Sequence, residues 1–393
     1  MKRNKIQPKQ SKTIIYNYGI QFVNIQQRTQ IMLNAISVFN TVRTFIWIAY
    51  FLLLTTESLG QWKHTEKFID QYAKTNRYNG TILVKQANKT YLKSFGTANF
   101  QFDVPNKPDT KYKIASITKL FTAVLIMQLY EAGKLDLHAT IKTYLPTYTG
   151  AAGDKATIFH LLTATSGIEN SEAGEDPNEV PSMFLKKYTT DQILQRYCSG
   201  RMENEPGKHY SYNNADYVIL GKIIEAIYGR PYEEVLRTQI LQPLKMHNSG
   251  MCSYQQVIEN LASVYSIDES TKELEADPFY YIENFYSAGA MYSTAEDLLL
   301  FSEALYNGGL LSDSSLKMLL TPYLESYGFG LWIRKLQINN HEIVMNERQG
   351  SIWGTTTRLL YIPQEKITII LLTNMYTTSL NTFQNEIIKA LIH

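Results

Sequence analysis

An apolar run between Ile117 and Leu129 follows a helical pattern and occupies nearly every position around the helix. Such a pattern is typical of a helix buried on all sides, not of an amphipathic surface helix. Two polar side chains interrupt the run at its start, Ser116 and Lys119, and a spacing of three residues places them on one face of a helical turn. A lysine buried there needs a partner or a chemical role. We therefore expect this helix to lie at the centre of the fold.

Strand patterns lie at both ends of the chain, and helical patterns lie between them. The β-branched segments 81–85 and 90–95 flank a short turn and predict a hairpin. Near the C-terminus, the sequence predicts an antiparallel meander and a closing helix at 328–335, 341–345, 356–362, 366–373 and 377–392. Helices are predicted at 62–75, 158–165, 190–197, 215–228, 231–241 and 294–306. This order predicts an α/β (α+β) fold, in which N- and C-terminal segments share one antiparallel sheet, flanked by helices, and a mostly helical part is inserted between them.

The first 60 residues have the layout of an export signal. Residues 1–43 carry seven Lys and Arg residues and no acid, and the apolar stretch 45–54 follows them. A basic region, a short apolar region and small residues before a cut are typical of a signal peptide, with cleavage expected after Gly60. An uncleaved N-terminal membrane anchor is the alternative, and a start at Met32 would shorten the unusually long basic region. Both interpretations place the body, 61–393, in the periplasm or outside the cell.

Charge and cysteine content narrow the class of protein. The residues after 43 hold 31 of the 38 Lys and Arg residues and all 36 Asp and Glu residues, so the body is mildly acidic. This balance argues against a nucleic-acid partner, which needs a concentrated basic face. Cys198 and Cys252 are too few for a disulfide scaffold, although an exported protein could pair them. The seven histidines show no pair at ligand spacing, so no metal site is expected.

The Ser116-x-x-Lys119 pattern suggests nucleophilic catalysis. A serine hydroxyl becomes a nucleophile when a neighbouring base takes its proton, and Lys119 can be that base if burial favours its neutral form. The helix N-terminus adds free N–H groups that favour an oxyanion. The alternative is a capping serine beside a structural lysine. A second copy, Ser314 and Lys317, lies in a surface-type helix start, where a capping serine and a solvated lysine are expected.

Two further groups of residues could complete such a site. In Tyr212-x-Asn214, a phenol near a lysine can move a proton and a carboxamide can hold a substrate amide. Ser211-x-Asn213 overlaps it as an alternative, and Asn214 could simply cap the next helix.

Arg348 lies at a strand end, two residues before Gly350, where the backbone can be approached closely. A cation in this place could receive a carboxylate, with a backbone N–H behind it, although such an arginine is more often a solvated charge.

Several ordered motifs together resemble the class C β-lactamase-like family of serine hydrolases, which includes D-Ala-D-Ala carboxypeptidases and related esterases. The motifs are Ser116-Ile-Thr-Lys119 with Gly133-Lys-Leu-Asp-Leu137, His160-Leu-Leu-Thr-Ala-Thr-Ser-Gly167, Pro206-Gly207, Tyr212-Asn-Asn214, Tyr217-x-x-Leu-Gly221 and Ser287-Ala-Gly-Ala-Met-Tyr-Ser-Thr-Ala-Glu-Asp297. The resemblance covers roughly residues 65–390, and the combination is far more specific than any one motif.

The resemblance implies a β-lactamase/transpeptidase-like fold, with a sheet subdomain formed by 61–115 and 325–393 and a helical subdomain formed by 116–324. It also implies a role for each site residue. These are Ser116 as the acylated nucleophile, Lys119 as its proton partner, Tyr212 as the catalytic phenol, Asn214 as a ligand of the substrate's acyl side chain, Arg348-Gln349-Gly350 as the third substrate-binding motif, and the backbone N–H groups of Ser116 and Ser351 as the oxyanion hole. No metal or organic cofactor is implied.

Two departures from the family pattern bear on the substrate. Arg348 replaces the usual Lys or His, so a carboxylate-binding cation is kept but proton transfer is lost. Ala164 replaces a common His in the motif at 160–167. The sequence therefore predicts an exported serine hydrolase that acts through an acyl-enzyme on an amide, ester or lactam carbonyl, with a peptidase or esterase of small-molecule or peptide substrates, such as cell-wall material, favoured over a lactamase.

Other classes of protein find less support. A catalytically inactive penicillin-binding-like or peptidoglycan-binding protein is the alternative, but intact Ser116, Lys119 and Tyr212 argue against it. The chain has no Gly-x-Ser-x-Gly elbow, and Gly328-Phe-Gly330 lacks the third glycine of a dinucleotide loop.

Overall fold

The computed structural model describes residues 11–170, 180–268 and 270–392, and the chain divides into two compact units, residues 1–65 and 66–393. Helix α1 (Ser11–Thr75) makes up the described part of the first unit and continues into the second, so the predicted helix 62–75 is its final part. The predicted cleavage position after Gly60 falls inside α1. Residues 1–10 of the predicted basic region lie outside the described residues. Among the described residues, none of the helices has a stretch long and apolar enough to cross a lipid bilayer.

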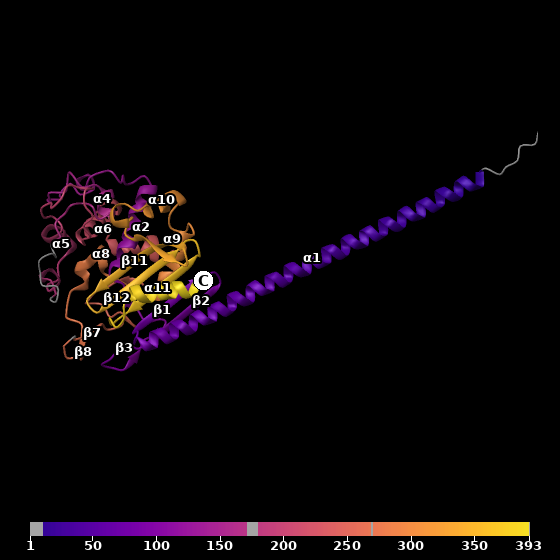
Figure 1. Ribbon diagram of the computed structural model, residues 1–393. Coiled ribbons are helices and arrows are strands. Elements are labelled where there is room, and N and C mark those ends of the chain that lie inside the picture. The colour runs from indigo at the N-terminus through magenta and orange to yellow at the C-terminus, as the bar shows by residue number, and fades with distance from the viewer. Residues whose placement is uncertain (1–10, 171–179, 269, 393) are drawn as a thin grey trace, which may run out of the picture. The chain divides into compact units, whose positions relative to one another are not determined.

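The second unit is built around an antiparallel sheet that, within the described residues, has six strands in the order β10-β11-β12-β13-β1-β2 (Figure 1). Their bounds are Gly80–Gln86 for β1, Lys89–Phe95 for β2, Trp332–Ile338 for β10, His341–Ile352 for β11, Thr355–Ile362 for β12 and Ile367–Thr373 for β13. β1 pairs with β13 from Gly80↔Thr373 to Gln86↔Ile367. This pairing confirms the prediction that both ends of the chain share one sheet.

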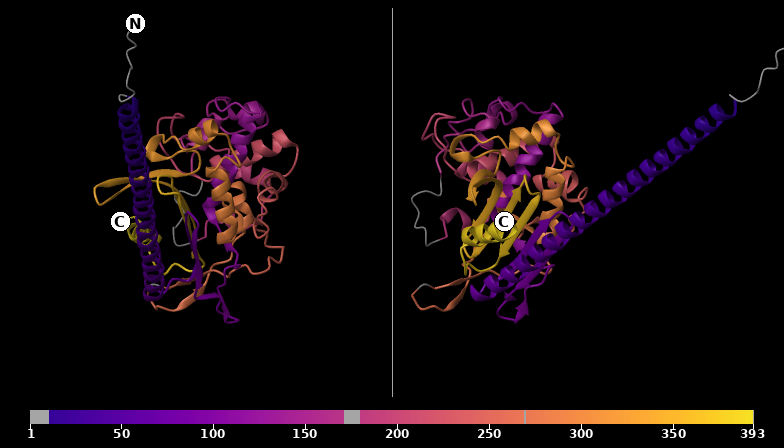
Figure 2. Two further views of the ribbon diagram at one scale, coloured as in Figure 1. Left: turned by 90° about the vertical axis from the view of Figure 1, so that its right-hand side faces the viewer. Right: turned by 45° about the vertical axis from the view of Figure 1, so that its right-hand side comes forward.

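Helices cover both faces of this sheet (Figures 1 and 2). Helix α11 (Leu380–Leu391) lies on one face, where Phe383 stacks on Tyr72 with ring centroids 4.3 Å apart. Helix α9 (Ala295–Tyr306) lies on the other face, where Tyr306 stacks on Tyr361 at 3.8 Å. Because both faces are covered, every residue of the central strand β13 is buried. The near-continuous apolar run of this strand is the sequence signature of that position.

The predicted central helix is α2 (Thr118–Glu131), of which 11 residues are buried. It packs against α6 (Ala215–Tyr228), α8 (Tyr286–Gly289) and α9, and Phe121 stacks on Phe301 of α9 at 3.8 Å. Gly133 follows the helix with φ +66°, a conformation that glycine adopts without strain. The burial of the whole circumference confirms the sequence prediction for this helix.

In the part of the chain that the structure describes, the remaining elements form the helical region and three small sheets. The helices and turns are η1 (Ala115–Ile117), α3 (Ile141–Tyr144), α4 (Ile158–Leu162), η2 (Ser182–Phe184), α5 (Thr190–Tyr197), α7 (Tyr232–Leu236), η3 (Arg237–Leu241), η4 (Ile282–Phe285), α10 (Asp313–Leu319) and η5 (Leu324–Ser326). The short strands are β3 (Thr97–Asn99), β4 (Val104–Pro105), β5 (Tyr112–Lys113), β6 (Gly250–Met251), β7 (Tyr265–Ile267), β8 (Leu274–Ala276) and β9 (Met291–Ser293). Cys198 and Cys252 are both buried, and no disulfide joins them.

Two boundaries differ from the sequence prediction. The strand expected from residue 328 begins only at Trp332, because Gly330 adopts φ +83° and the chain turns there. The strand expected to end at residue 345 continues to Ile352 and pairs with β12 along 346–352. The added residues form a hairpin with β12, from which only residues 353 and 354 separate them. The division of the second unit into a sheet and a helical subdomain stays a prediction.

Candidate active site

The candidate nucleophile Ser116 lies in the turn η1, between β5 and α2. Ala115 before it has φ +48°, which is uncommon for a residue with a Cβ and is maintained only where the surroundings impose it. Those surroundings include the backbone bond from Ile114 N to Met291 O at 2.9 Å and the bond from Thr118 Oγ1 to Ala115 O at 2.7 Å. The three-stranded sheet β5-β9-β6 therefore fixes the turn from which Ser116 projects.

Lys119 is fully buried, and its ammonium contacts groups from three elements. Nζ donates to Ser116 Oγ at 3.1 Å, to Asn214 Oδ1 at 2.6 Å and to the Ala288 carbonyl of α8 at 2.8 Å. A buried ammonium is costly unless it is hydrogen-bonded, and these acceptors satisfy that requirement. The structure thus brings the predicted pair Ser116 and Lys119 into direct contact.

Tyr212 reaches the same serine from the loop before α6. Its hydroxyl donates to Ser116 Oγ at 2.9 Å and accepts from Arg348 Nη2 at 2.6 Å. Burial alone would raise the pKa of Tyr212, but the nearby charges of Arg348 and Lys119 lower it to about 8. The phenol can therefore lose its proton at a pH only slightly above neutral, within hydrogen-bond reach of the hydroxyl that it would deprotonate.

The guanidinium of Arg348 is 1% exposed and lies beneath Tyr212 and Ser116. Nε donates to the Ser116 carbonyl at 2.6 Å, and Nη1 donates to the Tyr327 hydroxyl at 2.9 Å. Burial opposes the charge of Arg348, but the phenols of Tyr212 and Tyr327 raise its pKa overall. Sequence reasoning did not find Tyr327, because nothing local distinguishes it from the other tyrosines of the chain.

Strand β11 presents a free edge beside η1. Its pairing with β10 ends at Trp332↔Glu347, whereas its pairing with β12 continues to Ile352↔Thr355. The two elements approach closely because Gly350 has no side chain: an added Cβ would lie 2.3 Å from the Ile114 carbonyl oxygen. This places residues 348–352 next to Ser116, as the sequence predicted from the glycine.

Asn214 occupies the N-cap position of α6, but its carboxamide oxygen accepts from Lys119. The neighbouring Asn213 does the capping instead, because its Oδ1 accepts from the backbone N–H of Asp216 at 2.8 Å. The two asparagines that the sequence left as alternatives therefore have separate tasks, with Asn214 directed at the site.

A buried acid, Asp216, lies in the first turn of α6 behind this loop. Its Oδ1 accepts from Ser166 Oγ at 2.5 Å, and burial raises the pKa of Asp216 to about 8 despite the nearby charge of Lys119. Sequence reasoning missed this residue, since an acid in the first turn of a helix is usually a surface group that favours the helix dipole.

The motif at 160–167 holds the loop that carries Tyr212. Ser211 N donates to the Ala164 carbonyl at 2.9 Å, and Gly207 N donates to the Thr165 carbonyl at 2.8 Å. Ala164 has φ +53° and is buried. Ala164 therefore supports this loop through its backbone carbonyl.

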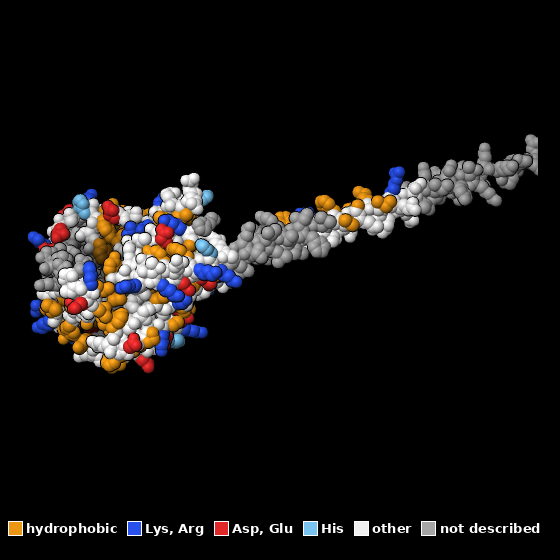
Figure 3. All heavy atoms as spheres, turned by 60° about the horizontal axis from the view of Figure 1, so that its bottom comes forward, with side chains coloured by type: hydrophobic (Ala, Val, Ile, Leu, Met, Phe, Trp, Pro, Cys, Tyr) orange, Lys and Arg blue, Asp and Glu red, His pale blue; other side chains and the backbone are white. Residues whose placement is uncertain are grey.

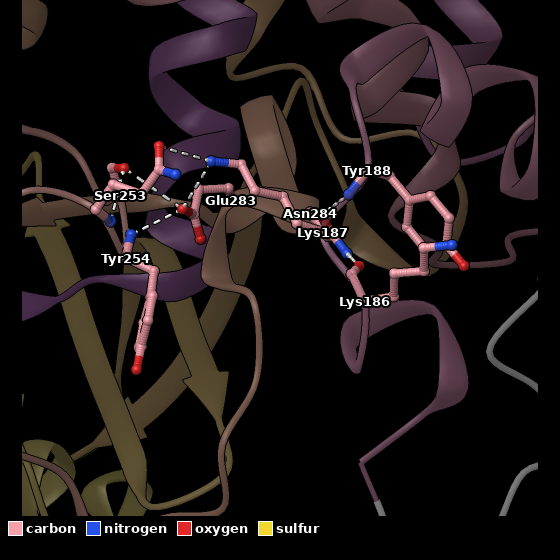
Figure 4. Close-up of polar contacts among 8 residues, drawn as sticks. Lys186, Lys187, Tyr188, Ser253, Tyr254, Glu283 and Asn284 are labelled. Carbon is pink, nitrogen blue, oxygen red and sulfur yellow. Dashed lines mark hydrogen bonds and ion pairs between the residues drawn. The ribbon is translucent and has the colours of Figure 1, made fainter.

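Helix α8, whose Ala288 carbonyl accepts from Lys119, directly follows the turn η4. Figure 4 shows the polar contacts that Glu283 and Asn284 of this turn make with other loops. Asn284 donates from Nδ2 to the carbonyls of Met183 and Lys186 at 2.6 and 2.7 Å. Glu283 Oε1 accepts from the backbone N–H of Tyr254 at 2.7 Å. These bonds anchor η4 to two distant loops and so fix the position of the Ala288 carbonyl.

The second Ser-x-x-Lys pattern lies on the surface, in α10, where Ser314 and Lys317 are both exposed. The capping residue of this helix is Ser312, whose side chain accepts from Ser315 N, and not Ser314. Neither Ser314 nor Lys317 lines the cavity at Ser116. The expectation of a solvated lysine is confirmed, and the capping role falls to a residue two positions earlier.

A cavity of about 450 Å³ opens beside Ser116 and Tyr212. It is lined by Ser116, Tyr212, Trp332, Gln349, Ser351, Thr356 and Arg358. A neighbouring cavity of about 650 Å³ shares Ser351 and Thr356 with it and extends to Glu275 and Asp277. Across the described residues, no cluster of His, Cys, Asp or Glu has the arrangement of a metal site. On the face of the second unit drawn in Figure 3, basic and acidic side chains are interspersed, and neither sign gathers into one large patch.

Comparison with known proteins agrees with this geometry. A family model described as Beta-lactamase matches residues 65–390. The teichoic acid D-alanine hydrolase of Staphylococcus aureus (strain MRSA252) is 24% identical over 320 residues, covering 79% of this chain and 73% of that protein. The crystal structure of a penicillin binding protein from Bacillus halodurans has a TM-score of 0.71 and 27% identity, covering 82% of this chain and 99% of that chain. The D-amino acid amidase from Ochrobactrum anthropi SV3 shares the fold, with a TM-score of 0.70 at 21% identity over 84% of this chain and 97% of that chain.

Proposed function

The chain belongs to the Beta-lactamase family of serine hydrolases, and we propose that it forms an acyl-enzyme at Ser116 and hydrolyses ester or amide bonds. One observation carries this proposal: Ser116 Oγ lies within hydrogen-bond distance of both Lys119 Nζ and Tyr212 OH, at 3.1 and 2.9 Å, beside the cavity. A serine placed between two groups that can exchange protons has the arrangement required of an activated nucleophile.

In the proposed mechanism, Tyr212 in its phenolate form takes the Ser116 proton while Oγ attacks the carbonyl carbon. The tetrahedral oxyanion is bound by the backbone N–H groups of Ser116 and Ser351. When the bond to the leaving oxygen or nitrogen breaks, Tyr212 returns the proton to that atom. A water molecule then repeats the same steps on the acyl-enzyme and releases the acid. Lys119 keeps its positive charge beside the phenol and supports the phenolate throughout.

Asn214 and the free edge of β11 are proposed to hold the substrate. The Asn214 amide group can donate to an acyl carbonyl, while its oxygen remains bonded to Lys119. The backbone of residues 349–351 can pair with an extended substrate as an added strand would. Within the family, a relative named teichoic acid D-alanine hydrolase supports esters of D-alanine as first substrates to test.

Labelling with a serine-reactive phosphonate tests the proposal. Mass spectrometry of the digested protein should find one adduct, on Ser116. Ser116→Ala should abolish it, whereas Ser314→Ala, which alters the surface copy of the motif, should leave it unchanged. Labelling that survives Ser116→Ala would contradict the mechanism, and absence of labelling in the wild-type protein would favour an inactive binding protein. A fluorescent penicillin used in parallel reports whether a lactam is also accepted.

We also propose that the protein is exported, cut after Gly60 or kept as an N-terminal anchor. The basic content of residues 1–43 and the apolar stretch 45–54 support this. Intact mass spectrometry of protein from fractionated cells tests it. A periplasmic or secreted form beginning at Gln61, or a full-length form in the membrane fraction, is expected. A full-length chain of 45.1 kDa in the cytosolic fraction would overturn the proposal.

A further inference from the structure

The cation of the third motif, Arg348, is already engaged by the protein. Its three guanidinium nitrogens bond to Ser116 O, Tyr327 OH and Tyr212 OH at 2.6, 2.9 and 2.6 Å. The side chain is 1% exposed and does not line the cavity over Ser116. A residue that receives a substrate carboxylate needs to present its nitrogens to that cavity. Here they face the catalytic serine and its phenol from behind.

Adjacent acids do not neutralise this guanidinium. Glu347, the next residue, points to the opposite face of the strand and pairs with Arg334 at 2.9 Å and with Arg358 at 3.2 Å. The oxygen nearest to Arg348 that can become an anion is therefore the Tyr212 phenol, 2.6 Å away. A buried cation is strongly stabilised by an anionic partner in hydrogen-bond contact. The geometry accordingly favours a phenolate on Tyr212.

The cavity itself offers little to an anionic substrate. The arginine that lines it, Arg358, is 8% exposed and donates from Nη2 to Asn381 Oδ1 at 2.6 Å while it pairs with Glu347. The adjoining cavity beyond Ser351 and Thr356 is lined by two acids, Glu275 and Asp277. A substrate carboxylate in these two adjoining cavities would lie between Arg358, which is already bonded to Asn381 and Glu347, and the acids Glu275 and Asp277, which would repel it.

On the basis of the proposed function, we infer that Arg348 is a positioning residue for Tyr212 and Ser116, and that the site accepts esters and amides without a carboxylate beside the scissile bond. This role differs from the carboxylate receptor that the sequence suggested for Arg348. A carboxypeptidase substrate, which ends in a carboxylate one residue after the scissile bond, is disfavoured. An ester or amide with a neutral or cationic leaving group is favoured.

Matched substrates test the specificity with the wild-type protein alone. The 3-carboxyphenyl, 3-carbamoylphenyl and 3-(aminomethyl)phenyl esters of N-acetyl-D-alanine differ mainly in charge, and their alkaline hydrolysis rates correct for intrinsic reactivity. The neutral and cationic esters should show kcat/KM at least about tenfold above that of the carboxylate ester. Equal or higher kcat/KM for the carboxylate ester would overturn the inference. Ser116→Ala should abolish turnover of all three esters. Turnover that survives this substitution would contradict the proposed function, whichever ester the wild-type protein prefers.

Substitution of Arg348 tests the positioning role. Several titratable groups face Tyr212: Lys119 from α2, Arg348 from β11, Tyr217 from α6, Tyr327 before β10 and Tyr210 from its own loop. Arg348→Met removes the cation bonded to the phenol, so the acid limb of kcat/KM for the neutral ester should move to higher pH by about one unit or more. kcat should fall, KM should change less than about threefold, and Arg348→Lys should restore part of the shift.

The control for this substitution is Arg334→Met, which removes an exposed arginine of the neighbouring strand β10 that also pairs with Glu347. It should leave the pH profile unchanged. If Arg348→Met instead raises KM for the carboxylate ester alone and leaves the profile of the neutral ester in place, Arg348 is a substrate receptor and the inference is wrong. If the variant fails to fold, the comparison of the three esters on the wild-type protein still decides the specificity.

Discussion

Lys119 Nζ donates a 2.6 Å hydrogen bond to Asn214 Oδ1, and this bond joins the start of α2 to the start of α6. The two residues are 95 positions apart, and each belongs to a different motif. Their contact means that the ammonium beside Ser116 is held by the residue proposed to bind substrate. Occupation of the site and orientation of the lysine are therefore coupled through one carboxamide.

Removal of this carboxamide should affect both stability and activity. Asn214→Ala takes one acceptor from a buried ammonium and should lower the free energy of unfolding by about 1 to 3 kcal/mol. It should also lower kcat/KM by about 10²-fold, since both the lysine and the acyl group lose a partner. Asn214→Asp keeps an acceptor for Lys119 and should retain stability. Denaturant unfolding and ester hydrolysis measure the two effects, and an Asn214→Ala protein as stable and active as wild type would contradict them.

The hydroxyl of Tyr212 should matter more than that of its neighbour Tyr210. Tyr212→Phe removes the bond to Ser116 but keeps the ring, which packs near Trp332 with centroids 5.9 Å apart. We expect kcat to fall by about 10² to 10⁴-fold, the usual contribution of a positioned acid or base. Tyr210→Phe is the matched control, because Tyr210 lies in the same loop but does not line the cavity at Ser116. Steady-state kinetics on one neutral ester compares them, and similar losses in both variants would remove Tyr212 from the mechanism.

Gly350 should not tolerate a methyl group. A Cβ there would lie 2.3 Å from the Ile114 carbonyl oxygen and 2.5 Å from Thr357 Oγ1, so β11 and η1 would have to separate. Gly350→Ala should cost about 1 to 3 kcal/mol of stability and should lower activity, because the separation displaces Ser116. At Gly200 the nearest atom to an added Cβ is 3.5 Å away, so Gly200→Ala serves as the control. Thermal unfolding and kinetics of the two variants should differ clearly, and equal behaviour would contradict the steric argument.

Asp216 should make the stability of the protein depend on pH. Its pKa in the folded protein is about 8, against an ordinary value of 3.8. Between about pH 4 and pH 8 the unfolded chain releases this proton while the folded protein retains it, so the contribution of Asp216 to stability is lost as pH rises. Asp216→Asn removes the titration. From pH 5 to pH 8 the wild-type protein should therefore lose stability through this group, whereas the variant should not. The difference between the two free energies of unfolding, variant minus wild type, should grow by more than about 1 kcal/mol over this range, because one pKa unit corresponds to about 1.4 kcal/mol.

Denaturant titrations of both proteins at several pH values measure this difference. Asp191→Asn, in the exposed first turn of α5, is the control for the substitution itself. A difference between Asp216→Asn and wild type that stays constant from pH 5 to pH 8 would show that Asp216 is ionised in the folded protein.

The sequence alone determined the central helix and the shared sheet, and it predicted the candidate residues that the structure brings together around Ser116. These follow from local patterns: the apolar circumference of α2, the β-branched strands and the three-residue spacing of Ser116 and Lys119. The sequence also indicated the left-handed turn at Gly133 and the close approach of two backbone segments at Gly350, since each requires glycine, the one residue without a Cβ.

Only the tertiary structure decided how those groups are held. The orientation of Arg348, the participation of Tyr327 and the burial of Asp216 depend on contacts between elements far apart in the chain, which a local pattern does not contain. An arginine at a strand end has the same local sequence pattern whether its side chain faces a substrate or a tyrosine. Here the side chain lies beneath Tyr212, because β11 extends past its local pattern to pair with β12 and carries Arg348 behind the serine.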